Sequence, residues 1–263
     1  MNIDWGTLGE YLKLDHQTLK AMGVTAYTAI ISQIIGVVVG LGSASMQRSR
    51  NKVARLIAGT YVWLVRGTPL IVQIFFIYYG TNIILGFQLI PRTVTLFGVG
   101  LPGAVVGGIA ALSINEGAYM SEIIRASINS IDRGQLESAQ SLGLRKTVAM
   151  RRIIWPQAAR VIVPPLGNEF NNMLKSTSLL SFIGINELFN DAQVRYSATF
   201  QPVEYFMGVA IIYLALTTVW SFVQAWIERR LSAGYTAARP VENSKTRWAT
   251  RAMGLKLGAG RAK

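Results

Sequence analysis

The sequence predicts an all-α membrane protein whose chain crosses the bilayer five times. Three observations support this fold class: 51% of the 263 residues are hydrophobic, only 15% are charged, and the charges avoid five long apolar stretches. An ordinary soluble domain carries roughly 25% charged residues. The mean hydropathy of +0.35 points the same way. The composition therefore argues against a disordered chain and against a typical cytosolic enzyme.

Each of the five apolar stretches is long enough to form a transmembrane helix. The fourth contains only Glu169 and Lys175 as charged residues and the others contain none; the stretches are residues 21–47, 67–91, 93–115, 161–186 and 205–227. At about 1.5 Å per residue, even the shortest reaches roughly 34 Å, enough to cross a hydrocarbon core of about 30 Å. The runs are continuous rather than alternating, so we expect helices and not barrel strands.

Lysine and arginine set the expected orientation. Of the 26 basic residues, 20 lie in the segments 48–55, 125–160 and 228–263. Because cytoplasmic loops are enriched in Lys and Arg, we expect these segments inside, the N-terminus outside and the C-terminus in the cytoplasm. The net charge of +13 is thus interpreted as a topology signal and not as a nucleic-acid footprint.

The two ends of the chain are expected to lie outside the membrane domain, which comprises residues 21–227. Residues 1–20 alternate apolar and polar positions, which predicts a short amphipathic helix on the outer membrane face. Residues 228–263 form a basic cytoplasmic tail that anionic lipid would attract. Within the first stretch, Gly36 and Gly40 are spaced for close helix packing.

Catalysis is not expected in this chain. It has no Cys and a single His, His16, so neither a thiolate nucleophile nor a Cys- or His-based metal site is predicted. The sequence also lacks the G-x-x-x-x-G-K-[ST] phosphate loop. If the protein moves a solute uphill, the energy must come from an ion gradient or from another subunit.

The longest internal connection, residues 125–160, is basic yet contains apolar side chains. Gly143, followed by Leu144, Arg145 and Lys146, is typical of a helix stop and a turn into a second helix. Pro156 then marks the start of the next span. A two-helix elbow with apolar residues needs a cover, which is either the membrane surface or a cytoplasmic partner.

This elbow resembles the EAA motif of ABC importer permeases. The matching residues are Glu137, Ala139, Gly143, Ile153 and Pro156, at the spacing of that motif. Ser138 replaces the first alanine and Trp155 the leucine, so we expect the packing to differ there. Residues 66–73, 116–123 and 175–179 resemble the polar amino acid branch of the same family, and the resemblance covers most of residues 20–227.

The resemblance implies the five-helix, MetI-like fold of a type I importer permease in the cell inner (plasma) membrane. It implies ATP-driven import of a polar amino acid or a close analogue by alternating access. The implied partners are a second permease subunit, identical or homologous, a dimer of ABC ATPase subunits and an external solute-binding protein. Mg-ATP would be bound by the ATPase, so this chain would need no cofactor and would not itself be an enzyme.

By the same resemblance, the elbow is a coupling helix that sits in a groove of the ATPase. The residues expected to couple are Glu137, Ser138, Ala139, Gly143, Leu144, Arg145 and Pro156. Glu137 is expected to accept hydrogen bonds or to pair with Arg133 or Arg145, and so to fix the elbow. A Cβ at Gly143 would clash in a left-handed turn or at a close approach.

Charged and polar residues inside the spans are candidates for the substrate pathway. They are Glu169, Asn168, Lys175, Thr177, Ser178 and Gln73. Glu169 is expected to contact a substrate amino group or a cationic side chain or, alternatively, to pair with Lys175 or Arg66 and hold helices together. Lys175 and the hydroxyls after it suit a substrate carboxylate, or else hydrogen bonds between helices. Glu116 and Glu122 are six residues apart and do not share a helix face, so no acid–base site is built from them.

Two other function classes remain open from the residues. One is an ion-coupled secondary amino acid transporter, which internal repeats and a self-contained ion site would favour. The other is a membrane scaffold or receptor that transports nothing. The chain shows no clear repeat, and the elbow favours an ATPase partner.

Overall fold

A computed structural model describes residues 3–86, 90–96 and 98–232 of the chain. Its α-helices are α1 (Trp5–Leu12), α2 (His16–Gln47), α3 (Lys52–Arg66), α4 (Leu70–Phe75), α5 (Thr81–Leu85), α6 (Gly103–Asn129), α7 (Arg133–Ser141), α8 (Lys146–Ala149), α9 (Trp155–Ser176), α10 (Leu188–Thr199) and α11 (Pro202–Ser232). Three further segments are the π-helices η1 (Phe76–Gly80) and η2 (Met150–Ile154) and the 3₁₀-helix η3 (Thr177–Ile183). Strands β1 (Thr93–Leu96) and β2 (Val99–Pro102) pair antiparallel.

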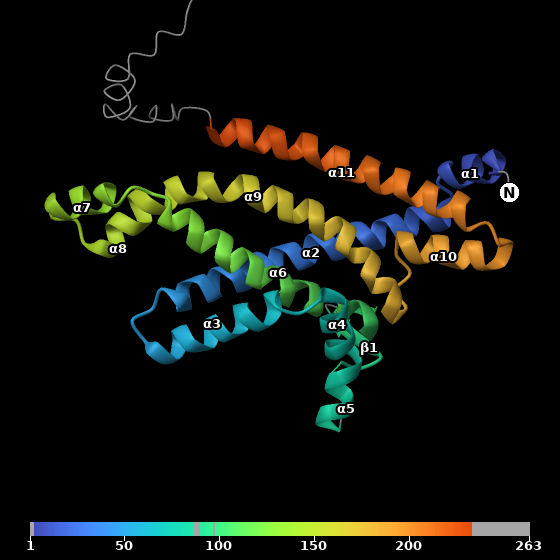
Figure 1. Cartoon of the computed structure of the whole chain (residues 1–263), viewed down its shortest axis with the longest axis horizontal. Helices are drawn as coiled ribbons and strands as arrows, with labels where there is room; N and C mark the ends of the chain where they lie inside the picture. Colours follow the sequence, from blue (N-terminus) through green and yellow to red (C-terminus); the bar gives the residue numbers. More distant parts are fainter. Residues whose placement is uncertain (1–2, 87–89, 97, 233–263) are drawn as a thin grey trace, which may run out of the picture.

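Long helices along one axis form the body of the molecule (Figure 1). Helices α7 and α8 lie at one end of this bundle, and α1 and α10 at the other (Figure 1). Polar caps start several helices: Asp15 accepts a hydrogen bond from the Thr18 amide at 2.8 Å, and Asp132 one from the Gly134 amide at 2.8 Å. Each side chain satisfies a backbone donor that the helix itself leaves free.

The most extensive helix contact among the described elements joins α2 and α6. Gly36 and Gly40 of α2 make this contact possible, as their spacing predicted. A Cβ on Gly36 would lie 2.4 Å from Cγ of Glu116, and one on Gly40 would lie 2.5 Å from Cβ of Met120. Any larger residue at these positions would push the two helices apart.

In the part of the stretch 67–91 that the structure describes, the helical run α4–η1–α5 covers residues 70–85, and helix α3, which precedes it, was not predicted. Helix α3 begins at Lys52, inside the basic connection 48–55, and ends at Arg66; α4 starts at Leu70 after a bend of 111°. Pro69 causes the break, because proline lacks an amide donor and disfavours helical geometry in the residue before it.

The third apolar stretch, 93–115, is also not a single helix. Its first part forms the hairpin of β1 and β2, in which Thr93 is opposite Pro102 and Leu96 is opposite Val99. Helix α6 starts only at Gly103 and continues to Asn129, beyond the apolar stretch and into the expected cytoplasmic loop. Apolarity alone could not separate strand from helix here. A run rich in Val and Thr fits a β-strand as well as it fits a membrane-spanning helix.

Two described helices are long and apolar enough to cross a membrane by themselves, His16–Gln47 and Pro202–Leu231. The bent pair of α3 with α4 and η1 adds a third if it counts as one span. Helices α6 and α9 have 27 and 22 residues, but polar and charged side chains interrupt their apolar surface. The number of five spans therefore stays a prediction.

The ends of the chain follow the expectation in part. Helix α1 is the short helix expected in residues 1–20, and its buried Leu8 and Tyr11 face α11, where Gly208 lies against Tyr11. Helix α11 extends to Ser232, so the expected tail 228–263 starts as helix. The rest of the tail, from residue 233, lies outside the described residues.

Candidate functional site

Helix α7 ends at the turn that the sequence predicted. Gly143 has a φ of +81°, in the left-handed region. The Gly143 amide donates to the carbonyl of Gln140 at 2.9 Å, and the Leu144 amide donates to that of Ala139 at 3.1 Å. These two bonds form a Schellman motif, which satisfies the last carbonyls of the helix. Open space surrounds the position of a Cβ on Gly143, so glycine is needed there for its backbone and not for a close approach.

The elbow of α7 and α8 presents a mixed surface at the end of the bundle (Figure 1). Ala139 points inward and is 1% exposed, whereas Leu142 is 82% exposed. Glu137, Ser138 and Arg145 are exposed around it. Pro156 is the second residue of α9 and directly follows the π-helix η2, inside the helical run that starts at Lys146. An apolar tip ringed by charges is typical of a surface that binds another protein.

The expected ion pair of Glu137 is not formed. Within the part of the chain that the structure describes, neither Arg133 nor Arg145 makes a salt bridge to it. Backbone bonds hold the elbow instead, together with the Ser141 hydroxyl, which donates to the carbonyl of Glu137 at 3.0 Å. The Glu137 carboxylate is therefore available to a partner, at the edge of a polar pocket of about 470 Å³ that Arg48 and Arg133 also line.

A second candidate site lies inside the bundle, at the junction of α3, α4, α6 and α9. We call it the acidic pocket, and its volume is about 360 Å³. Its polar lining comprises Thr68, Asn115, Glu116, Tyr119, Glu169, Asn172 and Ser176. Two carboxylates thus share one cavity without a basic residue in its lining.

Glu116 is held in the acidic pocket by a buried hydrogen bond. Its side chain is 4% exposed and accepts from Nε2 of Gln33 on α2 at 2.7 Å. Glu116 was not predicted as a site residue, although it is the first charge after the third apolar stretch. Its pocket partner Glu169 comes from α9, 53 positions later in the chain, and sequence spacing could not bring the two together.

The predicted ion pairs of Glu169 are wrong as well. Arg66 lies instead 3.8 Å from the carboxylate of Glu122 and over the ring of Tyr119, at 5.3 Å from its centroid. In the described residues no salt bridge joins Glu169 to Lys175. Arg66 is near enough to interact electrostatically with Glu169 but forms no salt bridge with it among the described residues. A carboxylate inside a membrane protein that forms no salt bridge is a candidate for binding a cationic ligand.

Gln73 does not line the acidic pocket but holds residues of its wall in place through hydrogen bonds. Its Nε2 donates to the carbonyls of Val65 and Thr68 at 2.6 and 3.1 Å, and so fixes the bend before α4. Its Oε1 accepts from Nδ2 of Asn115 at 3.0 Å. Gln73 therefore positions both the broken helix and one polar group of the pocket wall.

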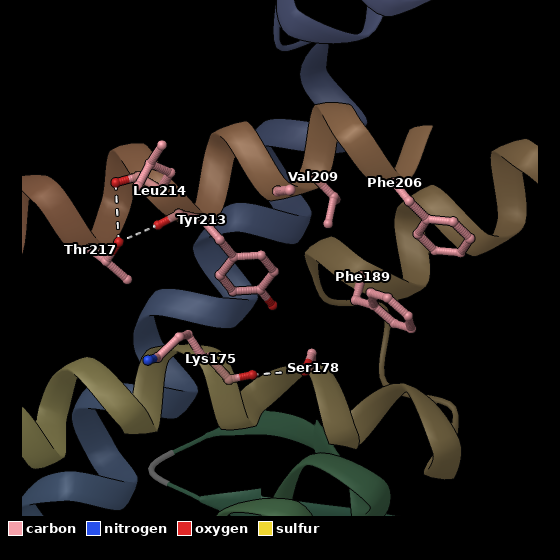
Figure 2. A pocket seen from close by; sticks show the side chains of 9 residues that line it. Lys175, Ser178, Phe189, Phe206, Val209, Tyr213, Leu214 and Thr217 are labelled. Atoms are coloured by element: carbon pink, nitrogen blue, oxygen red, sulfur yellow. Dashed lines mark hydrogen bonds between the residues drawn. The ribbon is translucent and has the colours of Figure 1, made fainter. Parts of the chain in front are cut away.

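The other predicted pathway residues lie elsewhere. Asn168 faces α11, with its Oδ1 3.5 Å from Nε2 of Gln224. Thr177 is buried and donates to the carbonyl of Leu174 at 2.8 Å. Lys175 and Ser178 line a separate groove of about 680 Å³ along α11, which we call the α11 groove (Figure 2).

The α11 groove has a polar and an apolar end. Figure 2 shows Lys175 below Thr217 at one end, and the rings of Phe189 and Phe206 at the other. The Tyr213 side chain points into the groove between them (Figure 2). Glu169 and Lys175, only six residues apart on α9, thus serve different cavities.

A polar network ties the other end of the bundle together. Arg195 on α10 binds Asp15 at 2.8 Å and the buried Asp191 at 3.1 Å. The hydrogen bond from the Thr18 amide, followed by that from Arg195, lowers the pKa of Asp15 from 3.8 to about 2. This network connects the start of α2 to α10. Among the described residues, no cluster of three or more metal-ligating side chains occurs.

Comparison with known proteins agrees with this architecture. Residues 36–233 match the family described as "Binding-protein-dependent transport system inner membrane component". The chain is 36% identical to a probable amino-acid permease protein, YxeN, of Bacillus subtilis, over 89% of this chain and 98% of that one. It is 37% identical to the arginine transport system permease protein ArgU of Corynebacterium glutamicum, over 88% and 73%.

A solved structure described as an amino acid ABC transporter with histidines is also similar. It superimposes with a TM-score of 0.76 at 36% identity and covers 88% of this chain and 100% of that one. The family match spans most of the chain and includes the bent α3–α4 pair, the elbow and both cavities. The chain therefore belongs to the family of inner-membrane components of binding-protein-dependent importers.

Proposed function

We propose that this chain is the permease subunit of an ATP-driven importer for an amino acid with a positively charged side chain. The observation that carries the substrate class is the acidic pocket, where Glu116 and Glu169 face one cavity with no basic residue in its lining. A guanidinium or ammonium group would supply the missing charge, and carboxylate–guanidinium bonds are strong and directional. The relative from Corynebacterium glutamicum, named as an arginine permease, supports the same class.

The remaining parts of the importer follow from the resemblance and the family. We propose five spans, with the N-terminus outside and the C-terminus in the cytoplasm of an inner membrane. Two permease subunits would act with two ATPases and a solute-binding protein, and Mg-ATP would be hydrolysed on the ATPases only. Membership of this family does not favour the ion-coupled secondary transporter.

In the proposed mechanism the elbow carries the motion. Leu142, Leu144 and Arg145 would sit in a groove of the ATPase, with Glu137 and Ser138 beside them. Closure of the two ATPases would move the elbow, and with it the continuous helical run from Lys146 to Ser176. Because Glu169 is part of that run and Glu116 is not, the pocket would change shape during each cycle. Lys175 and Ser178 would meet a carboxylate only outside the acidic pocket.

The substrate class is tested with a matched pair of ligands. Arginine and citrulline have nearly the same shape, but only arginine carries a cationic side chain. We expect the purified transporter, freed of its binding protein, to bind arginine at least about tenfold more tightly, a difference of about 1.4 kcal/mol. Isothermal titration calorimetry measures both ligands.

Two substitutions localise the effect to the pocket. Glu116→Gln and Glu169→Gln should each reduce the difference between the affinities for arginine and for citrulline. Glu204→Gln is the control, because Glu204 is similarly buried at 7% exposure but lies at the outer end of α11, where it accepts from the Asp4 amide. Equal affinities for arginine and citrulline in the unmodified protein would refute the proposed substrate class.

The orientation is tested with single cysteines, because the chain contains none. Leu142 on the elbow and Phe200 before α11 are both 82% exposed, so their reactivities are comparable. In cells that produce the permease without the ATPase, which would cover Leu142, we expect a membrane-impermeant maleimide to label Phe200→Cys in intact cells and Leu142→Cys only in inverted vesicles. The opposite pattern would reverse the proposed topology.

A further inference from the structure

Helix α11 is poorly covered by its own chain. The apolar windows of α2 and α11 have almost the same mean hydropathy, 1.9 and 2.0, yet 39% of the first is buried and only 17% of the second. Leu214, on the rim of the α11 groove, is 65% exposed. Lipid could cover an apolar helix, so exposure alone does not identify what lies against α11.

Lys175 distinguishes this groove from an ordinary lipid-facing surface. From Phe206 to Thr217 the groove extends roughly 16 Å along α11, at about 1.5 Å per residue, inside the apolar stretch 205–227. Within the described residues the Lys175 ammonium makes no salt bridge or hydrogen bond. A charge at this depth is costly against lipid tails and normally faces protein or water. The end of the groove at Lys175 is therefore expected to face protein or water and not lipid tails.

The described residues also include an apolar element that the bundle covers on one side only, where α4 and η1 pack on α6. The arm, which we define as α4, η1 and α5 (residues 70–85), projects sideways from the bundle (Figure 1). Phe76 is 55% exposed, Tyr79 46% and Ile83 80%. Helix α5 packs mainly on η1 and so remains within the arm.

The arm and the groove lie at the same level along the bundle. The root of the arm contacts η3, since the rings of Phe75 and Phe182 are 6.5 Å apart. The groove adjoins the same short helix through Ser178. A two-fold axis parallel to the bundle preserves this level, so it would bring the arm of a second copy to the height of the groove.

We propose that the arm of a second copy of this chain packs into the α11 groove, and that the contact is reciprocal. Phe76 and Ile83 of the arm cover the apolar end and the exposed Leu214. The ring of Tyr79 offers the Lys175 ammonium a cation–π partner inside the membrane. The inference rests on the proposed function only in that the permease acts in pairs.

The test uses two differently tagged copies of the chain, produced together with the ATPase and the binding protein. One copy carries Leu214→Cys, and the other carries Phe76→Cys, Tyr79→Cys or Ile83→Cys in turn. Because each copy has a single cysteine, every cross-linked product joins two chains. The matched control replaces Leu214→Cys by Val38→Cys on α2, a position that is also 65% exposed. A short bismaleimide and an oxidant are applied to native membranes.

We expect at least one arm position to link to Leu214→Cys in the greater part of the protein, and none to link to Val38→Cys. Linking to Val38→Cys alone, or no link at all, overturns the proposed interface and assigns the groove to lipid or to a different protein. Uptake and ligand binding are measured on the same membranes. Failure of the interface with uptake intact therefore leaves the proposed function standing.

Discussion

The elbow and the acidic pocket differ in how far apart along the chain their residues lie. The turn of the elbow is closed by bonds between residues three to five positions apart, such as Leu144 to Ala139. The pocket is closed by contacts such as Gln33 to Glu116, which are 83 positions apart. A single local motif therefore builds the surface that meets the ATPase in our proposal, whereas the substrate pocket exists only once the helices have packed.

The largest effect is expected at the elbow. Gly143→Asp places a side chain in a left-handed conformation, which costs about 1–2 kcal/mol, and adds a charge to the coupling surface. Since the turn is far from the pocket, arginine binding should persist while uptake falls to near background. Uptake and ATP hydrolysis are measured in reconstituted vesicles.

Gly42→Ala is the control for this prediction, because Gly42 lies in α2 with open space around its Cβ position. The control should transport normally. Substrate-stimulated ATP hydrolysis that stays coupled to uptake in Gly143→Asp would contradict the role of the elbow.

An intermediate effect is expected at Gln73, which positions the wall of the acidic pocket. Gln73→Leu removes the donors to Val65 and Thr68 and the acceptor of Asn115, and leaves the part-buried Val65 carbonyl and Asn115 amide without this partner, at a cost of about 1 kcal/mol for each lost hydrogen bond. The protein should melt several degrees lower and bind arginine more weakly, because the pocket wall is no longer fixed. Differential scanning fluorimetry and calorimetry measure the two changes.

Gln47→Leu provides the comparison, since Gln47, the last residue of α2, bonds Ser121 at 3.1 Å and also interacts with Glu122, and none of these residues lines the acidic pocket. It should lower the melting temperature less and leave arginine affinity unchanged. Equal loss of affinity in both variants would mean that Gln73 has no special part in the pocket.

The smallest effect is expected at Asp15, which makes both a local and a distant contact. It caps α2 through the Thr18 amide and binds Arg195, 180 positions away. Because its pKa falls from 3.8 to about 2 in the folded protein, its contribution is complete above the unfolded pKa and is lost as the pH falls toward 2.

Asp15→Asn keeps a capping side chain but loses the charge. At neutral pH it should melt at most about 4 °C below the unmodified protein, because exposed ion pairs contribute little. The two melting curves should converge as the pH is lowered to about 2. A difference that is independent of pH would show that the Asp15 charge adds no stability.

The sequence was most informative where the structure is local. The stop at Gly143, the start of α9 near Pro156 and the helix in residues 1–20 were all predicted and are all present. The first and fifth apolar stretches match α2 and α11, because each is one long helix without an internal break.

Prediction from the sequence failed where tertiary contacts determine the structure. Helix α3 lies between two of the predicted apolar stretches, and the β1–β2 hairpin lies in a stretch whose apolarity fits a continuous helix equally well. Glu116 was set aside because its neighbour Glu122 is on another face, whereas its actual pocket partner is on α9. The salt bridges considered for Glu137 and Glu169 are not formed among the described residues, for a related reason. Two side chains that are close in sequence need not point toward each other.

The helical run from Lys146 to Ser176 has a mechanical consequence. It passes without interruption from α8 through the wider π turn of η2 into α9, whereas α6 is separated from the elbow by residues 130–132. In the proposed mechanism, a displacement of the elbow would reach Glu169 through this run, past Pro164 and Pro165, while the hydrogen bond from Gln33 would hold Glu116 to α2. Each ATPase cycle would move the carboxylate of Glu169 relative to that of Glu116. ATP hydrolysis would thus weaken the binding of the substrate in the acidic pocket.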